Sequence, residues 1–262
     1  MTNIINTLAK NATAAANCVS ENYKFLSTQQ AHEVLASFGF TESRYRQSKG
    51  AGERQGFQKH ISIFERGTNT DKDEDGRFNL LMLNSHDGSS SLRLEAGYFR
   101  ILCENQLGSG DVGVRIIHRG EALTRFADSI PLVIHQMELF KEVKALLRDK
   151  VLNTDAQMEL ARLALQLREV KLDTLDAYQT ERNLLNMLIR RRYEDTGNNA
   201  WKVFNAVQEN VVKGGVRLYQ NAGTVEAPKD VLRKIRPLTS AERLLDVNNA
   251  LTECAIQLAR AA

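Results

Sequence analysis

The period of the hydrophobic pattern changes once along the chain, near residue 120. Between residues 44 and 118, apolar and polar residues alternate in short runs such as His60–Glu65, which is typical of half-buried β-strands. From about residue 120 onward, apolar residues recur at the spacing of amphipathic helices. Strands followed by helices predict an α+β fold, with an N-terminal antiparallel β-sheet and a short helix before a mainly helical C-terminal half.

Glycine-containing polar stretches divide the first part into about four or five strands. We expect turns at 50–56, 67–76 and 108–113. The strands expected between and around these turns are 44–47, 58–66, 77–84, 92–103 and 112–119.

Capping residues and apolar spacing predict the helices. Ser27, with a Gln three residues later, starts a short helix that Gly39 ends. In the second half we expect helices at 122–148, with a break or kink at Pro131, then at 154–167, 173–193 and 200–214, and after Pro237. The chain then divides into a flexible tail (1–20), a β-rich region (21–120) and a helical region (121–262). We expect the last two regions to form one integrated domain or two closely packed domains.

Composition excludes several classes of protein. A chain of 262 residues with a net charge of +3 is long enough to bury a substantial core, and it is not a strongly basic duplex-coating protein. The cysteines are few, odd in number and far apart, which argues against disulfides and a zinc knuckle. No secretory signal or apolar run of about 20 residues is present, so we expect a cytoplasmic protein without membrane contact.

Residues 84–91, Asn-Ser-His-Asp-Gly-Ser-Ser-Ser, concentrate polar groups between two apolar strands. Adjacent His86 and Asp87 could serve as a general base or a metal site only if the backbone turns, because neighbours on a strand point to opposite faces. The alternative is a tight turn whose Asn, Asp and Ser side chains bond local backbone groups. We favour the turn and keep the ligand-facing loop open.

Two other strand ends carry groups with possible chemistry. His118 and Arg119 close the last strand, and could share a rim with His86 if the two strand ends are neighbours. Cys103 and Glu104 end another strand, where a buried structural thiol is the favoured interpretation. The candidate catalytic residues are therefore His86, Asp87, Glu104 and His118.

The segment from Asp71 to Gly76 imitates the start of a calcium loop. Position 12 of such a loop should be a bidentate Glu, but here it is Met82, and no helix is expected on either side. A polar hairpin turn explains the segment better. We predict no metal and no cofactor.

Basic residues cluster in the C-terminal third. Arg190, Arg191 and Arg192 end a predicted helix, where cations complement the macrodipole, and Tyr193 follows them. The alternative is a polyanion contact that includes Lys213, Arg217 and Arg119, with Tyr193 and Trp201 as stacking surfaces. A buried Trp201 beside Phe204 on one helical face is the competing interpretation for that aromatic residue.

The run from Leu83 to Asn105 resembles the signature of the phage/plasmid-like protein family designated domain of unknown function 932. Residues 114–120, the helix from Trp201 to Asn210 and the Gly214–Gly215 pair support the resemblance, which covers roughly residues 20–260. The resemblance implies a protein carried by phages, plasmids and integrative elements, often beside replication and recombination genes, with no agreed activity.

Three functions remain open. The first is a single-stranded DNA-binding accessory protein of a mobile genetic element, acting in replication, recombination or defence evasion. The second is a metal-dependent nuclease-like enzyme. Of the alternatives, we favour a protein that is not an enzyme. The third is a protein-interaction factor that inhibits a host enzyme, with a host or phage protein as partner and homo-oligomers possible.

Overall fold

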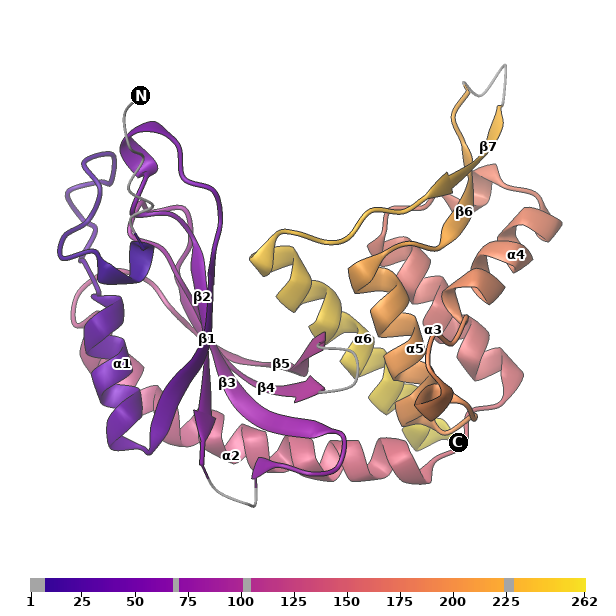
Figure 1. Cartoon of the computed structure of the whole chain (residues 1–262), viewed down its shortest axis with the longest axis horizontal. Helices are drawn as coiled ribbons and strands as arrows, with labels where there is room; N and C mark the ends of the chain where they lie inside the picture. Colours follow the sequence, from indigo (N-terminus) through magenta and orange to yellow (C-terminus); the bar gives the residue numbers. More distant parts are fainter. Residues whose placement is uncertain (1–7, 68–70, 101–104, 224–228) are drawn as a thin grey trace. The chain divides into compact units, whose positions relative to one another are not determined.

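A computed structural model shows the α+β fold expected from the sequence (Figure 1). The chain divides into two compact units, Met1–Phe140 and Lys141–Ala262, and each is described by itself. The division falls inside a helix that starts where the hydrophobic period changes. The structure describes residues 8–67, 71–100, 105–223 and 229–262.

The first unit is built on a five-stranded antiparallel sheet in which neighbours in sequence are neighbours in space. The four residues 80–83 of the central strand are all buried, because both faces of the sheet are covered there. The strands are β1 (Phe40–Gln47), β2 (His60–Arg66), β3 (Gly76–Asn84), β4 (Leu92–Arg100) and β5 (Asn105–Ile116).

Two helices flank this sheet. The first, α1 (Thr28–Ser37), begins at Ser27 as predicted, and the Ser27 side chain accepts a hydrogen bond from the Gln30 N–H. The second, α2 (Ala122–Asp149), continues through Pro131, so the predicted break is wrong. A proline removes one backbone hydrogen-bond donor from the helix. Burial of the apolar face of α2 on both sides of Pro131 outweighs that loss. The buried residues of this face are Phe126, Ile130, Val133, Met137 and Phe140.

The segment 8–20, expected from sequence as a tail, is held against the sheet. It contains the 3₁₀ turn η1 (Ala9–Asn11), and Ala9 and Ala16 are buried. The Ala9 N–H donates to Gln47 Oε1 at 3.0 Å, and the Ala16 N–H donates to the His86 carbonyl at 2.9 Å. Backbone hydrogen bonds therefore tie this segment to β1 and to the end of β3.

Two glycine-containing stretches, both predicted to be turns, have different structures. The stretch 108–113, predicted as a turn, lies inside β5, where the register shifts opposite Glu95. Gly113 allows this approach, since a Cβ there would stand 2.5 Å from Glu95 Cγ. The calcium-like segment is a turn, in which Asp73 Oδ1 accepts the N–H groups of Asp75 and Gly76.

Among its described residues, the second unit contains the end of α2, four further α-helices and a two-stranded hairpin. The predicted helix 173–193 is wrong in extent: a capping box formed by Asp176 and Gln179 starts the helix, which ends at Met187. The hairpin was not predicted, because its strands are short, with five residues each. The elements are α3 (Thr154–Leu167), η4 (Leu172–Thr174), α4 (Ala177–Met187), η5 (Tyr193–Asp195), α5 (Ala200–Lys213), β6 (Arg217–Asn221), β7 (Asp230–Lys234) and α6 (Ala241–Ala261); a further 3₁₀ turn, η2 (Gly52–Arg54), lies in the first unit.

No helix in the described ranges has the length and apolar character that a membrane span requires.

Candidate functional site

Three of the five histidines meet at one edge of the first unit's sheet. His60 opens β2 and pairs in register with Asn84, the last residue of β3. His86 follows β3 by two residues, and His118 follows β5 by two residues. Strands β3 and β5 are each antiparallel to β4, so their C-terminal ends lie at the same edge.

The hydroxyl of Thr28, the first residue of α1, connects these groups. Thr28 Oγ1 lies 2.8 Å from His60 Nε2, 3.0 Å from His86 Nε2 and 3.2 Å from Asn84 Nδ2. Asn84 extends the network, because its Oδ1 accepts from His118 Nε2 at 2.9 Å. All five side chains are at most 4% exposed, so these groups form one buried network, which we call the histidine network.

The chemistry of each donor and acceptor assigns the protons. His60 Nδ1 lies 3.0 Å from the Gln58 carbonyl, which only accepts, so the proton of neutral His60 is on Nδ1. His60 Nε2 is then an acceptor for the Thr28 hydroxyl. The two lone pairs of Thr28 Oγ1 accept from Asn84 Nδ2 and from His86 Nε2, which must carry the His86 proton. The hydroxyl thereby uses its full hydrogen-bonding capacity.

This assignment leaves one atom unsatisfied. His86 Nδ1 is buried and has no hydrogen-bond partner. The His86 ring is instead packed against Phe25 and His60, at ring-centroid distances of 4.9 and 5.2 Å. The exposed fraction of the whole residue is 0%, so a substrate could not reach Nδ1 without a rearrangement of the surrounding segment.

Burial keeps the three imidazoles neutral. Loss of hydration lowers the pKa of His60 to about 4 and the pKa of His118 to about 4. For His86, burial and then the neighbouring His60 and His118 lower the pKa to about 3. The charged groups that face the network are few: the Asp87 carboxylate raises the pKa of both His60 and His86, Glu42 raises that of His60, and His32 lowers it.

Aromatic packing holds the outer side of the network. The Tyr23 ring stacks on His118 with centroids 4.8 Å apart and an interplanar angle of 12°. The Tyr23 hydroxyl donates to the Ser85 carbonyl at 3.0 Å. Burial, followed by the charge of Asp87, raises the pKa of Tyr23, so it stays a donor at neutral pH.

The structure joins two of the four predicted catalytic residues. His86 and His118 share the network, as expected if their strand ends are neighbours. Asp87 does not bond either of them; its Oδ1 accepts from the Ser89 N–H and hydroxyl within a local turn. Glu104 and Cys103 lie outside the described residues.

The segment 84–91 forms the local turn that we favoured, and it also directs two side chains inward. Asp87 and Ser85 satisfy local backbone groups, as a structural turn requires, since Ser85 Oγ donates to the Ser90 carbonyl and accepts from the Ser90 N–H. Asn84 and His86 point into the histidine network. Across the part of the chain that the structure describes, no group of three or more His, Cys, Asp or Glu residues has metal-binding geometry.

Sequence reasoning missed Thr28, His60 and Tyr23. Thr28 was interpreted as part of a helix start, and His60 as the first residue of an alternating strand. Nothing in their spacing relates them to His86, because the relation depends on the β2–β3 register and on where α1 is placed.

A second candidate site is a groove of about 560 Å³ in the second unit. Three cations line it, one from the loop after α4 and two from the open end of the β6–β7 hairpin, and the lining contains no carboxylate. We call it the basic groove; its lining residues are Asn186, Ile189, Arg191, Gly215, Val216, Arg217 and Lys234.

Two of these cations stand directly opposite each other. Arg217 and Lys234 are a cross-strand pair of β6 and β7, and both side chains are exposed. Among the described residues, neither side chain has a hydrogen bond or an ion pair. Like charges opposite each other destabilise a hairpin, so a bound anion would relieve this repulsion.

The other predicted nucleic-acid contacts have protein partners. Arg190 Nε and Nη2 donate to the carbonyls of Asp195 and Gly197, and Arg191 Nε donates to Asn210 Oδ1 at 2.7 Å. Arg192 and Lys213 both pair with Glu209. Although burial raises the pKa of the Glu209 carboxyl, these two cations outweigh it and hold the pKa below its usual range.

The remaining predicted nucleic-acid contacts, two aromatic residues and Arg119, differ in their exposure to solvent. Tyr193 is 88% exposed. Trp201 is 3% exposed, and its ring lies under the Lys144 ammonium. The prediction of a stacking surface at Trp201 is therefore wrong, and its interpretation as a core residue is confirmed. Arg119 is exposed in the first unit, and its carbonyl accepts from the Arg125 guanidinium.

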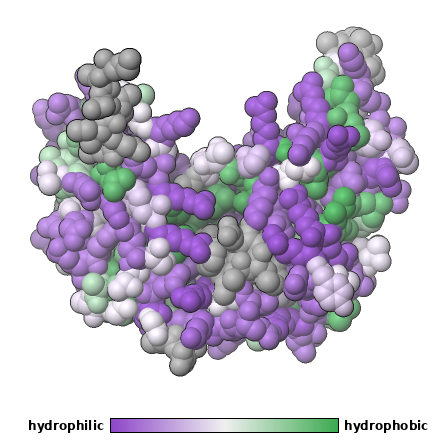
Figure 2. Space-filling model, viewed as in Figure 1, coloured by the Kyte–Doolittle hydropathy of each residue, from purple (hydrophilic) through white to green (hydrophobic). Residues whose placement is uncertain are grey.

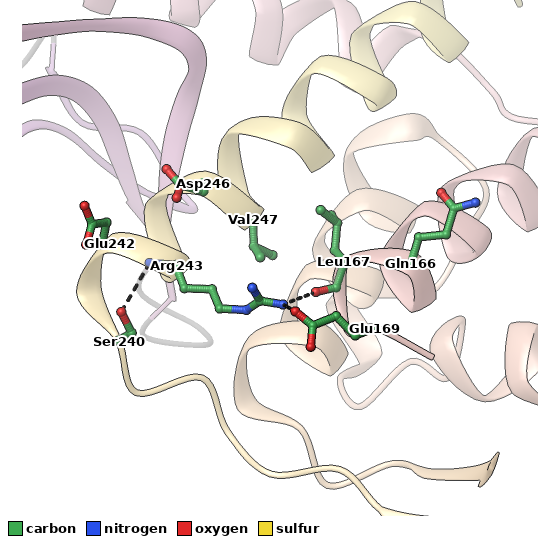
Figure 3. Close-up of a pocket in the computed structure, with 8 residues that line it drawn as sticks. All are labelled: Gln166, Leu167, Glu169, Ser240, Glu242, Arg243, Asp246 and Val247. Carbon is green, nitrogen blue, oxygen red and sulfur yellow. Dashed lines mark hydrogen bonds and ion pairs between the residues drawn. The ribbon is translucent and has the colours of Figure 1, made fainter. Parts of the chain in front are cut away.

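A third feature is a pocket of about 490 Å³ at the end of α3 and the start of α6 (Figure 3). Arg243 crosses it, and its Nη2 donates to the Leu167 carbonyl at 2.9 Å and to Glu169 Oε1 at 2.8 Å. Glu169 is the single described non-glycine residue with a positive φ, 59°. Helix termination explains this φ, because the Glu169 N–H bonds Gln166 O and the Val170 N–H bonds Leu165 O in a Schellman motif.

Glu169→Gly is expected to be more stable than Glu169→Ala by about 1 kcal/mol, because glycine adopts the left-handed conformation without a Cβ penalty. Both variants lack the exposed ion pair with Arg243, so the comparison isolates the backbone conformation. Urea unfolding of the two proteins measures the difference. Equal stabilities would show that α3 ends differently.

Comparison with known proteins gives a family but no activity. The model described as "Domain of unknown function (DUF932)" matches residues 15–246. UPF0380 protein YafZ of Escherichia coli (strain K12) is 28% identical over 201 residues, which cover 75% of this chain and 70% of that protein. UPF0380 protein YfjQ of the same strain is 29% identical over 205 residues, with the same coverage. No solved structure matches the chain. The chain therefore belongs to the family of the domain of unknown function DUF932.

Proposed function

We propose that this protein binds single-stranded DNA through the basic groove, as an accessory factor in replication or recombination of a mobile element. The observation that carries the proposal is the exposed cross-strand pair Arg217 and Lys234, which lies with Arg191 in a groove without a lining carboxylate. Planar guanidinium groups and an ammonium are the donors that phosphate oxygens accept most strongly.

The surroundings of the groove support a polyanion ligand. Between residues 211 and 240 six Lys and Arg residues stand against two acidic residues. Arg191 is held in place, because it donates to Asn210 Oδ1 and to the Gly214 carbonyl. A guanidinium that is already oriented loses less side-chain entropy when it binds a phosphate.

The groove favours a single strand over a duplex. Its volume of about 560 Å³ accommodates the backbone of a few nucleotides. Sequence-independent binding of a single strand needs cations along the phosphate backbone rather than contacts to base edges. The expected complex is therefore salt-sensitive and tolerant of sequence.

Arg217→Ala/Lys234→Ala is expected to weaken binding of a fluorescent oligo(dT) roughly tenfold or more at low salt, because two phosphate contacts are lost. The slope of log K against log salt should become shallower by about 1.4, at roughly 0.7 for each contact to a single strand. Fluorescence anisotropy at several salt concentrations measures both quantities.

The matched control removes two cations from the same hairpin outside the groove. Lys229→Ala/Arg233→Ala lowers the net charge equally, and neither residue lines the groove. This control should retain most of the affinity. If this control loses as much affinity as Arg217→Ala/Lys234→Ala, only the net charge matters and the groove is not the binding site. If the unaltered protein does not bind oligo(dT) at low salt, the proposed function is wrong.

A further inference from the structure

One face of the β6–β7 hairpin continues the basic groove with a half-buried tyrosine and an exposed leucine. Because side chains alternate along a strand, Tyr219 points to the same face as Arg217. In the antiparallel register, Arg217 pairs with Lys234 and Tyr219 pairs with Leu232. A pair of cations is therefore followed, one step along the hairpin, by an aromatic residue and a leucine.

Helix α4 adds a second aromatic ring to this face. Tyr178 lies against Tyr219 with ring centroids 6.3 Å apart and an interplanar angle of 60°. Tyr178 is 61% exposed and Leu232 is 48% exposed, so both present apolar surface to solvent on either side of Tyr219. Figure 2 shows apolar residues exposed among hydrophilic ones over the hairpin. We call Tyr178, Tyr219 and Leu232 the aromatic platform.

The platform is held in a defined position relative to the groove. The side chain of Asn183 bonds the edge of β6, where it accepts from the Tyr219 N–H at 2.7 Å and donates to the Tyr219 carbonyl at 2.9 Å. Asn186, which lines the groove, donates to the Arg217 carbonyl at 2.8 Å. These bonds fix α4 against β6, so the rings and the cations do not move independently.

The spacing suits a nucleotide. Residues two apart on a strand are separated by about 6.6 Å, which is comparable to the distance from a phosphate to the base of the same nucleotide. The face ends at Asp230, whose carboxylate accepts from Gln179 Nε2 at 2.7 Å and would repel a further phosphate. The available surface is therefore limited to one or two bases.

We propose that the aromatic platform stacks one or two bases of a single-stranded DNA whose phosphates lie in the basic groove. This inference rests on the proposed function and adds the residues that recognise bases. Aromatic rings stack on the π-face of any base, so the platform gives affinity without sequence preference. In a duplex the base faces are covered by neighbouring bases, so the platform selects single strands.

The test compares three polyanions, of which only the first carries bases: oligo(dT), an abasic phosphodiester oligomer of the same length, and inorganic polyphosphate. Tyr178→Leu is expected to bind oligo(dT) roughly tenfold more weakly than the unaltered protein and to bind the other two probes equally well. Tyr178→Phe keeps the ring and should retain the affinity. Because Tyr178 is exposed, both variants are expected to fold, and circular dichroism checks this.

Val151→Ala provides the control, since Val151 is a large exposed residue of the second unit that belongs neither to the groove nor to the platform. It should leave oligo(dT) binding unchanged. The platform is disproved if Tyr178→Leu binds oligo(dT) as the unaltered protein does, or if the unaltered protein binds oligo(dT) no better than the abasic oligomer. Either result leaves the groove proposal intact, whereas failure of all three probes to bind overturns the proposed function itself.

Discussion

Thr28→Val is expected to lower the free energy of unfolding by about 3–5 kcal/mol, which is a large part of the 5–15 kcal/mol typical of a domain. Valine has nearly the same shape as threonine but cannot bond. The change leaves His60 Nε2 without its donor and His86 Nε2 without its acceptor, both in a buried site. Each unsatisfied buried group costs about 1–3 kcal/mol. Urea unfolding followed by circular dichroism measures the loss.

Thr28→Ser is the control, because it keeps the hydroxyl and removes only a methyl group. Its expected cost is about 1 kcal/mol, the value for one buried methyl group. If Thr28→Val costs no more than Thr28→Ser, the two histidines bond each other or water instead, and the hydroxyl is not the centre of the network.

Acidification from pH 6.5 to pH 5 is expected to destabilise the protein by several kcal/mol, at about 1.4 kcal/mol per pH unit for each neutral buried histidine. The folded-state pKa values of His60, His86 and His118 lie at about 4, 3 and 4, below the ordinary value of 6.5. Between these values the unfolded chain binds more protons than the folded one. Stability is therefore fully present above pH 6.5 and is lost as the pH falls toward 4.

The network geometry gives the same result independently of titration. A proton added to His60 Nε2 would make it a third donor toward Thr28 Oγ1, whose two lone pairs already accept from Asn84 and His86. At least one hydrogen bond must break, at the point where α1 starts. Urea unfolding at pH 7, 6 and 5 measures the slope of stability against pH.

His118→Gln should reduce this slope by about one third, because one of the three buried histidines no longer titrates and the new amide can still donate to Asn84. Equal slopes in His118→Gln and the unaltered protein would contradict this, because they would show that the pKa of His118 is the same in the folded and the unfolded protein.

Much of the fold follows from local patterns. The change of period near residue 120, the Ser27 cap and the capped starts of α3, α5 and α6 are set by residues close together in sequence, and the structure has these features. Local patterns fail where glycine has more than one use. The stretch 108–113 was taken for a turn, but glycine also serves where two strands approach closely, as at Gly113 beside Glu95.

The candidate sites depend on contacts that local patterns do not encode. The sequence indicated His86, His118, Arg191 and Arg217 as residues with possible chemistry, but not their partners. His60 enters the network because β2 pairs with β3 in one register, and a shift of one residue would turn it to the other face. Lys234 joins Arg217 only because an unpredicted hairpin places them opposite each other.

The sequence alone thus determined where every helix except α4 begins among those expected, which half forms strands and which family the residues resemble, because capping and hydrophobic period act over a few residues. The tertiary structure decided that the segment from Leu83 to Asn105 contributes a structural turn at Asp87 and a buried network at Asn84 and His86. The reason is physical: Thr28, His60 and His118 lie 26 to 58 residues from His86 in the chain, and only strand register and the docking of α1 bring their polar atoms within hydrogen-bond distance.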